Sequence, residues 1–243
     1  MEVPQLGHGA PNPKPPRPPP PPVRAQPEPV RHLAQQRHPV AWIMAFGSLI
    51  IVNGNSSAGK STVARLMQAE LPQPFLLTGL DHFLHRVPDS LIGPPDEDVL
   101  RGWEVTFNNG EMASVPQTTP LGYQIINGIY AAIAAYCRAG NNAIVDAVMY
   151  DSEGVTLARK NFAGLKVFSV GLHCELAEAK RRERHRGDRA PGGAAAFDAL
   201  VHLHLRYDFS INVTNISAAD AAHLIVSEFL ERPEGTAFWA PGK

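Results

Sequence analysis

The segment from Gly54 to Ser61 constrains the fold of this chain more than any other. It reads Gly-Asn-Ser-Ser-Ala-Gly-Lys-Ser and fits the pattern G-x-x-x-x-G-K-[ST] at every fixed position. An apolar run at 48–53 precedes it, and residues 59–71 follow with apolar side chains at helical spacing. Because the motif lies between an expected strand and an expected helix, we interpret it as a phosphate-binding loop and not as a chance glycine-rich turn.

The motif also predicts which nucleotide contacts the loop makes. Backbone N–H groups of such a loop surround a phosphate, and the following helix adds the positive partial charge of its N-terminus. We expect Lys60 to contact the β- and γ-phosphates of ATP and the Ser61 hydroxyl to ligate Mg²⁺. The expected nucleotide-binding residues are Gly54, Asn55, Ser56, Ser57, Ala58, Gly59, Lys60, Ser61 and Thr62.

Strand and helix patterns alternate along the rest of the chain. This alternation predicts an α/β fold, a P-loop NTPase three-layer α/β/α sandwich with a five-stranded parallel sheet. A capping box, Ser217 with Asp220, is expected at the start of the last helix. Residues 83–117 contain four prolines and are expected to be irregular and to cover the site. Beyond the first strand and helix, we expect strands at 75–80, 143–148, 165–172 and 209–213, and helices at 122–139, 175–184, 194–206 and 218–230.

Two aspartates lie near the carboxyl ends of predicted strands, at the edge where open α/β sheets bind their ligands. Asp81 follows the second strand and could accept a proton from an attacking hydroxyl, or it could cap a helix. Asp146 closes the apolar run 143–145, which is the Walker B arrangement for holding Mg²⁺, although a capping role is again the alternative.

An arginine-rich run at 181–189 is the fourth candidate. Arg181 and Arg182 are expected to lie on a solvated helix face. Arg186 and Arg189 flank a glycine after the fourth strand, where small kinases carry a lid, and could offset charge in a phosphoryl-transfer transition state.

Histidines and aromatic residues give weaker signals. His82 and His85 could line an acceptor pocket but are expected to be solvated or packed. His202 and His204 are two residues apart, so they would point to different faces of a helix, and no zinc site is expected. Trp103, Phe107 and Tyr123 could form an aromatic pocket wall or pack in the core.

The chain divides by composition near residue 40. Thirteen of its 23 prolines lie in residues 1–39, which predicts a disordered, proline-rich tail at 1–43. A kinase domain is expected at 44–233 and a short C-terminal tail at 234–243. The proline tail could bind a proline-recognition module, although an inert tail is the simpler interpretation, and Met44 is an alternative translation start.

Charge and hydrophobicity exclude several classes of partner. A net charge of −1 argues against a broad nucleic-acid interface. The longest apolar stretch, 40–52, is shorter than the roughly 18–20 residues that span a bilayer, so no membrane partner is expected. Cys137 and Cys174 fit neither a disulfide scaffold nor a metal knuckle, and we expect buried free thiols in a cytoplasmic protein.

The candidate segments occur in one order: 53–61, 79–81 (Gly-Leu-Asp), 144–146 (Ile-Val-Asp) and 186–189 (Arg-Gly-Asp-Arg). That order and spacing resemble the chloramphenicol phosphotransferase-like family over about residues 48–231, and the later Tyr207-Asp208 and Thr214 fit the same pattern. The resemblance implies transfer of the γ-phosphate of ATP to a primary hydroxyl of chloramphenicol. It also implies that Asp81 is the general base and that Arg186 and Arg189 belong to the lid.

Three functional hypotheses follow. The first is an ATP-dependent phosphotransferase acting on a hydroxyl of a small molecule. The second is a toxin-type kinase that phosphorylates a nucleotide-sugar. The third is a non-catalytic ATP-binding switch or adaptor whose proline tail recruits a partner.

Overall fold

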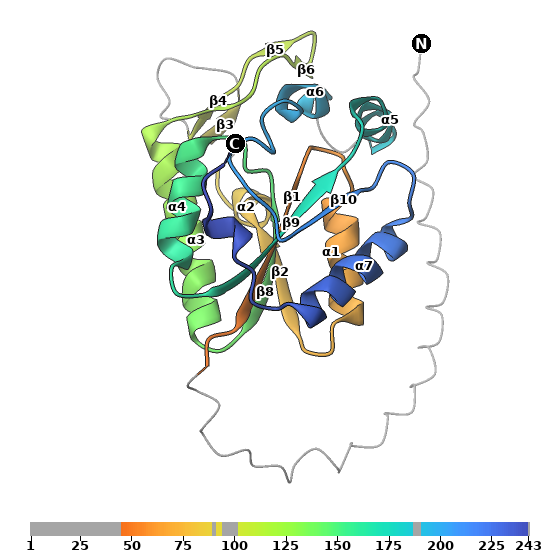
Figure 1. Ribbon diagram of the computed structural model, residues 1–243. Coiled ribbons are helices and arrows are strands. Elements are labelled where there is room, and N and C mark those ends of the chain that lie inside the picture. The colour runs from red at the N-terminus through yellow and green to blue at the C-terminus, as the bar shows by residue number, and fades with distance from the viewer. Residues whose placement is uncertain (1–44, 89–90, 94–101, 187–190, 243) are drawn as a thin grey trace, which may run out of the picture. The chain divides into compact units, whose positions relative to one another are not determined.

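A parallel sheet of five strands forms the centre of the second of the two units into which the chain divides (Figure 1). The structure is a computed structural model that describes residues 45–88, 91–93, 102–186 and 191–242. The strands are β1 (Ser48–Gly54), β2 (Phe75–Gly79), β8 (Asn142–Ala147), β9 (Lys166–His173) and β10 (Phe209–Asn212). Their order in the sheet is β10-β9-β1-β8-β2, and every neighbouring pair is parallel. The predicted fold class is confirmed.

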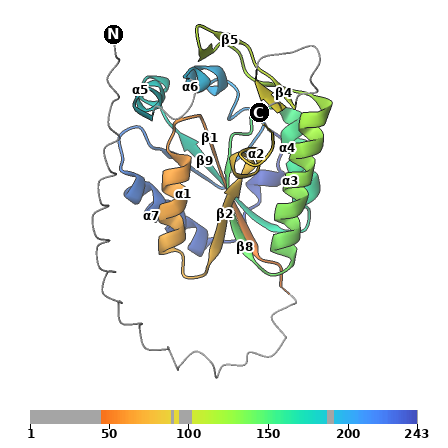
Figure 2. The same ribbon diagram turned by 180° about the vertical axis from the view of Figure 1, so that it is seen from behind.

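Strand β1 is apolar throughout because both of its faces are buried. Leu49 and Ile51 pack into one core, and Ile50 and Val52 pack into the other. The first core lies under α3 (Pro120–Arg138) and α4 (Ser152–Phe162), and the second lies under α1 (Lys60–Glu70) and α7 (Ala218–Glu231). Figures 1 and 2 show these two pairs of helices on opposite sides of the sheet. The sheet is therefore the middle layer of three.

Side-chain caps fix where several helices begin. Thr119 accepts a hydrogen bond from the Gly122 amide ahead of α3. At the start of α7, Ser217 accepts from the Asp220 amide at 3.0 Å, which confirms the expected cap. Helix α4 is not among the expected helices, although Asp151 caps it and its buried side chains lie at helical spacing. Within the described residues, no helix combines the length and the apolar character that a bilayer-spanning helix requires.

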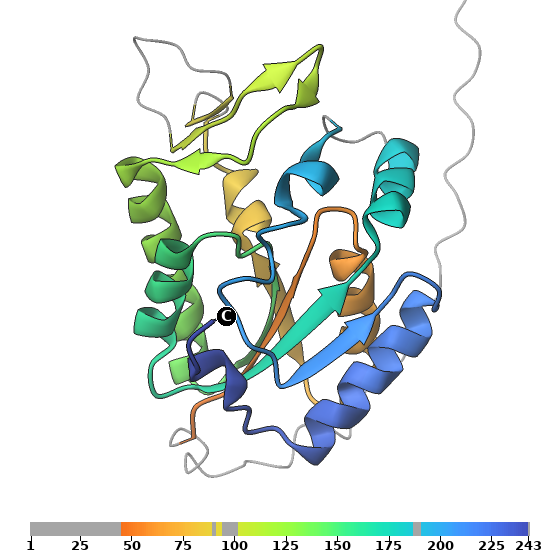
Figure 3. The ribbon, with the colours of Figure 1, turned by 45° about the horizontal axis from the view of Figure 1, so that its top comes forward.

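Small strands replace the irregular structure expected between residues 83 and 117. The chain first forms α2 (Leu80–Leu84), and the described residues beyond it then pair in two minor sheets. These strands are two residues long, so they show no alternation that the sequence could reveal. Figure 3 shows this yellow-green region above the carboxyl ends of the central strands. One sheet contains β3 (Ile92–Gly93), β4 (Trp103–Glu104) and β7 (Gln117–Thr118), and the other contains β5 (Phe107–Asn108) and β6 (Glu111–Met112).

The helix expected at 194–206 was wrong beyond its first turn. Helix α5 (Leu176–Arg186) forms as expected, but α6 covers only Gly193–Phe197, and turns follow it. The Val201 carbonyl there accepts a hydrogen bond from the Asn53 side chain, which shows that tertiary contacts override helix propensity. In the segment expected to be a C-terminal tail, Phe238 is fully buried in the core.

Candidate active site

The phosphate-binding loop continues directly from β1 into α1. A Cβ added to Gly54 would lie 2.6 Å from the Leu172 carbonyl oxygen, so only glycine allows β9 to pack this closely. Gly59 has φ 98°, a left-handed conformation that turns the chain into α1. The first residue of α1 is Lys60, so the positive end of the helix faces the loop.

The structure brings together Lys60, Ser61 and Asp146. The Lys60 ammonium donates to the Asn55 carbonyl at 2.9 Å and lies 4.0 Å from the Asp146 carboxylate. The Ser61 hydroxyl donates to Asp146 Oδ2 at 2.5 Å. Asp146 lies within β8, while Asp151 caps the helix that follows, so the capping alternative for Asp146 was wrong. The hydroxyl and the carboxylate are hard oxygen donors, the kind that Mg²⁺ prefers.

Asp81 lies on α2, beside the end of the strand next to Asp146. The cap of α2 is Gly79, without any side-chain hydrogen bond, so the capping alternative for Asp81 was wrong as well. Gly79 pairs in register with Asp146 of β8, and a Cβ there would meet the Asp146 carbonyl oxygen at 2.2 Å. This close approach of the two strands places both carboxylates on one cavity.

Two of the cavities formed by the described residues adjoin the phosphate loop. The apolar cavity, of about 240 Å³, lies between the loop, α2 and the minor sheets. The cationic cavity, of about 590 Å³, lies between the loop and α5 and contains four arginines. Both are lined by Ser57, Lys60, Ser61 and Arg186. The apolar cavity is otherwise lined by Ser56, Leu80, Asp81, Leu84, Trp103, Val105, Phe107, Met112, Pro116, Asp146, Ala147, Val148, Tyr150 and Phe197.

The residues of the loop fit a bound phosphate. The Ser57 hydroxyl is buried and has no hydrogen-bond partner among the described residues. A buried hydroxyl without a partner costs about 1–3 kcal/mol, and a phosphate oxygen would remove that cost. With the loop amides, the Lys60 ammonium and the arginines of the cationic cavity, the donor set suits a triphosphate.

Arg182 does more than the solvated role expected for it. Its side chain is half-buried and donates to the carbonyl oxygens of Ala58, at 3.0 Å, and Val213, at 2.8 Å. It therefore fastens α5 to the phosphate loop and to the end of β10. No sequence pattern links residues so far apart. Arg181 is exposed and pairs with Glu178, but it also lines the cationic cavity, and the predicted lid residue Arg189 lies outside the described residues.

The aromatic candidates divide between the cavity and other positions. Trp103 and Phe107 line the apolar cavity, whereas Tyr123 does not; its hydroxyl donates to Asp151 at 3.3 Å. Two further residues of the cavity wall, Tyr150 and Phe197, were not predicted from the sequence, and their ring centroids lie 5.0 Å apart. His82 and His85 are exposed and line neither cavity, which confirms the solvated interpretation.

Comparison with known proteins gives the family. The profile described as chloramphenicol phosphotransferase-like protein matches residues 47–230. The chain belongs to the chloramphenicol phosphotransferase-like family. Two relatives from Mycobacterium tuberculosis, strains CDC 1551 and H37Rv, are each 30% identical over 203 residues. The match covers 80% of this chain and 88% of each relative, and their names propose O-phosphotransferase activity.

Solved structures with low sequence identity share the fold of this family member. The APS kinase CysC of Mycobacterium tuberculosis, in complex with AMPPNP and APS, aligns with a TM-score of 0.52 at 16% identity, over 76% of this chain and 99% of that one. A sugar kinase from Janibacter aligns at 0.54 and 15% identity, over 77% and 96%. The Deinococcus radiodurans tunicamycin resistance protein aligns at 0.51 and 16% identity, over 75% and 95%.

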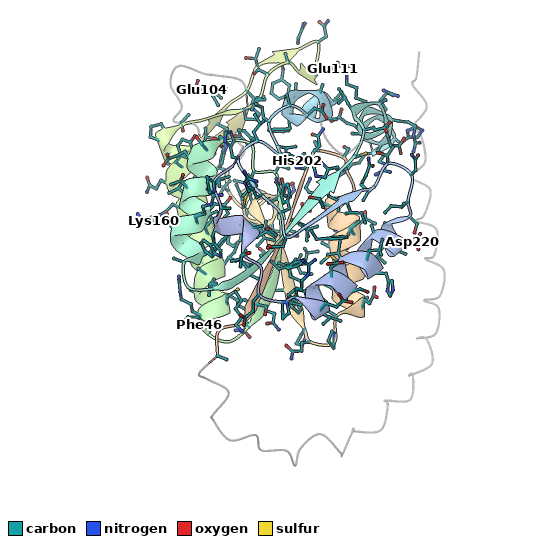
Figure 4. All side chains as sticks on the ribbon, in the orientation of Figure 1. Phe46, Glu104, Glu111, Lys160, His202 and Asp220 are labelled. Atoms are coloured by element: carbon teal, nitrogen blue, oxygen red, sulfur yellow. The ribbon has the colours of Figure 1, made fainter. Side chains whose placement is uncertain are left out.

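A polar network supports the strand that leads into the phosphate loop of this family member. The Asn53 amide donates to the Tyr207 hydroxyl at 2.8 Å, and that hydroxyl lies 2.7 Å from Nδ1 of His202. The His202 ring stacks on His173, with centroids 4.0 Å apart, near the carboxyl end of β9 (Figure 4). Burial lowers the pKa of His202 to about 4, with further contributions from His173 and Lys60. His202 is therefore neutral at pH 7 and can accept the Tyr207 hydroxyl proton.

This network predicts an acid-sensitive fold. Between pH 6.5 and 4, the unfolded chain binds a proton at residue 202 that the folded chain does not, so the free energy of unfolding falls as the pH is lowered. Because the ring is only partly buried, we expect a loss of about 1 kcal/mol between pH 7 and pH 5 from this residue. Urea unfolding at both pH values would measure it. We expect His202→Asn to reduce the pH dependence by that amount; a variant with the same pH dependence as the wild type would contradict the assignment.

Proposed function

We propose that this protein is an ATP-dependent kinase that transfers the γ-phosphoryl group to a hydroxyl of a small molecule. One observation carries the proposal: a single apolar cavity has Asp81, Asp146, Lys60 and Ser61 on its wall beside the phosphate loop. The fold, the family and the names of the relatives support the same reaction class.

The side chains would divide the work as follows. The loop amides and Lys60 would hold the triphosphate, and Arg186, which lines both cavities, would contact the phosphate that is transferred. Ser61 and Asp146 hold Mg²⁺, which neutralises developing charge on the phosphates. Asp81 orients the acceptor hydroxyl and accepts its proton. Arg189 is assigned with Arg186 to the catalytic arginines, and the kinase domain comprises residues 44–233 together with the segment around Phe238 that is buried in its core.

The apolar cavity would hold the acceptor. Its walls are mainly aliphatic and aromatic, so it favours an acceptor with an apolar body that presents a hydroxyl toward Asp81. Chloramphenicol, the substrate that gives the family its name, combines these features and is the first acceptor to test.

The direct test is a product assay with the full chain, ATP and Mg²⁺. The acceptor panel contains chloramphenicol, other hydroxylated antibiotics, nucleosides and nucleotide-sugars, and mass spectrometry detects the gain of one phosphoryl group. We expect phosphorylated chloramphenicol or a similarly apolar product. A phosphorylated nucleotide-sugar would show that the acceptor is a nucleotide-sugar and not an apolar small molecule. ATP binding without any product would favour a nucleotide-dependent switch.

A further inference from the structure

Glu183 is a buried carboxylate that the proposed reaction does not use. It lies on α5 and is 8% exposed, and its two carboxylate oxygens accept hydrogen bonds from the amides of Gly192, at 3.0 Å, and Ala194, at 2.9 Å. A buried charge is costly unless it is fully hydrogen bonded, so these two bonds hold the start of α6 firmly against α5.

The phosphate loop also forms hydrogen bonds with α6 and with the residue that follows it. The Asn55 amide donates to the Ala194 carbonyl oxygen at 2.9 Å and to Asp198 Oδ1 at 3.0 Å. A Cβ on Gly193 would lie 3.2 Å from the Ser56 hydroxyl and 3.4 Å from a Glu183 carboxylate oxygen. The packing leaves almost no room, so a shift of the loop or of α5 must move α6.

The far end of α6 forms a wall of the apolar cavity. Phe197 lines the cavity and packs against Tyr150, with ring centroids 5.0 Å apart. Just before α6, the Pro191 carbonyl oxygen accepts a hydrogen bond from the amide of Met112, which lines the same cavity. The segment 191–198 therefore contacts the loop, α5 and the acceptor wall at once.

We propose that Glu183 is a positioning residue that couples the two cavities through α6. Nucleotide phosphates engage the loop and the arginines of α5, and Glu183 and Asn55 transmit that engagement to Phe197 and the acceptor wall. By thermodynamic linkage, an acceptor in the apolar cavity changes nucleotide affinity by the same factor. The inference rests on the proposed function, because it takes the cationic cavity as the nucleotide site.

Trp103 makes the coupling measurable without a known acceptor. It lines the apolar cavity together with Tyr150, the ring that packs on Phe197. The chain has three tryptophans, so the experiment uses the full chain with Trp42 and Trp239 replaced by phenylalanine. AMPPNP with Mg²⁺ is titrated while calorimetry measures binding and fluorescence measures the response of Trp103.

We expect AMPPNP to change the Trp103 emission in this background. Glu183→Gln keeps the size of the side chain but replaces one acceptor oxygen with a donor, and we expect a response at least threefold smaller at saturating AMPPNP. Glu175→Gln, an exposed change just before α5, is the matched control and should respond as the background does. If Glu183→Gln lacks a cooperative thermal transition, Phe197→Leu replaces it, and the same loss of response is expected.

The outcomes separate the coupling from the proposed function. Calorimetric binding with a full Trp103 response in Glu183→Gln overturns the role of Glu183. Binding without any Trp103 response in the background overturns the coupling and leaves the nucleotide site intact. Absence of calorimetric binding in the background overturns both.

Discussion

Asp81→Asn is expected to lower kcat/KM for the phosphorylated acceptor by about 10²–10⁴-fold, the range that a general base contributes. The amide keeps the size of the side chain but cannot take up the hydroxyl proton. Asp81 lies in the first turn of α2, next to the end of β2, and lines the apolar cavity with Asp146. It does not line the cationic cavity, so we expect AMPPNP affinity to change by less than about threefold.

Steady-state kinetics with the acceptor that the wild type phosphorylates would test this expectation, and calorimetry would measure AMPPNP binding. Asp220→Asn is the matched control, because Asp220 is also in the first turn of a helix and lines neither cavity. Figure 4 shows Asp220 at the start of α7, at the edge of the molecule. Transfer by Asp81→Asn at more than a tenth of the wild-type rate would remove Asp81 from the role of base.

Local patterns made the sheet and the phosphate loop predictable from the sequence. Helical layers cover both faces of the strand at 48–53, so its residues are apolar at consecutive positions. Such a run can be recognised in the sequence alone. The order of the strands in the sheet could not be predicted from local patterns, because it depends on packing and register between segments that are distant in sequence. The turn structure after Phe197 was mispredicted because Asn53, some 150 positions earlier, takes the Val201 carbonyl.

The residues of the site also divide into those that a local pattern identifies and those whose position depends on distant contacts. Lys60, Ser61, Asp81 and Asp146 could be chosen because each adjoins a strand end, and parallel strands end at one edge. Tyr150 and Phe197 carried no local signal, because their positions depend on each other and on the minor sheets. Arg182 is the clearest case: its neighbours suggested a solvated helix face, but its partners lie in the phosphate loop and beyond β10.

Lys60→Met is expected to reduce kcat/KM by about 10³-fold, equivalent to about 4 kcal/mol of transition-state stabilisation. Lys60 is 7% exposed, and its ammonium is held 2.9 Å from the Asn55 carbonyl oxygen and 4.0 Å from Asp146. In so buried a position a charge acts on phosphate with little screening. Methionine has a similar length, so the substitution removes the charge and leaves the cavity nearly filled.

The same substitution should weaken AMPPNP binding by only about tenfold, because the loop amides and the arginines of the cationic cavity remain. A larger effect on turnover than on binding is what a charge acting mainly in the transition state produces. Lys160→Met is the control, since Lys160 lies on the outer face of α4 (Figure 4). A kcat/KM within tenfold of the wild type would show that another group stabilises the transferred phosphoryl. Equal losses in AMPPNP affinity and in kcat/KM would show that Lys60 binds the ground state and the transition state equally.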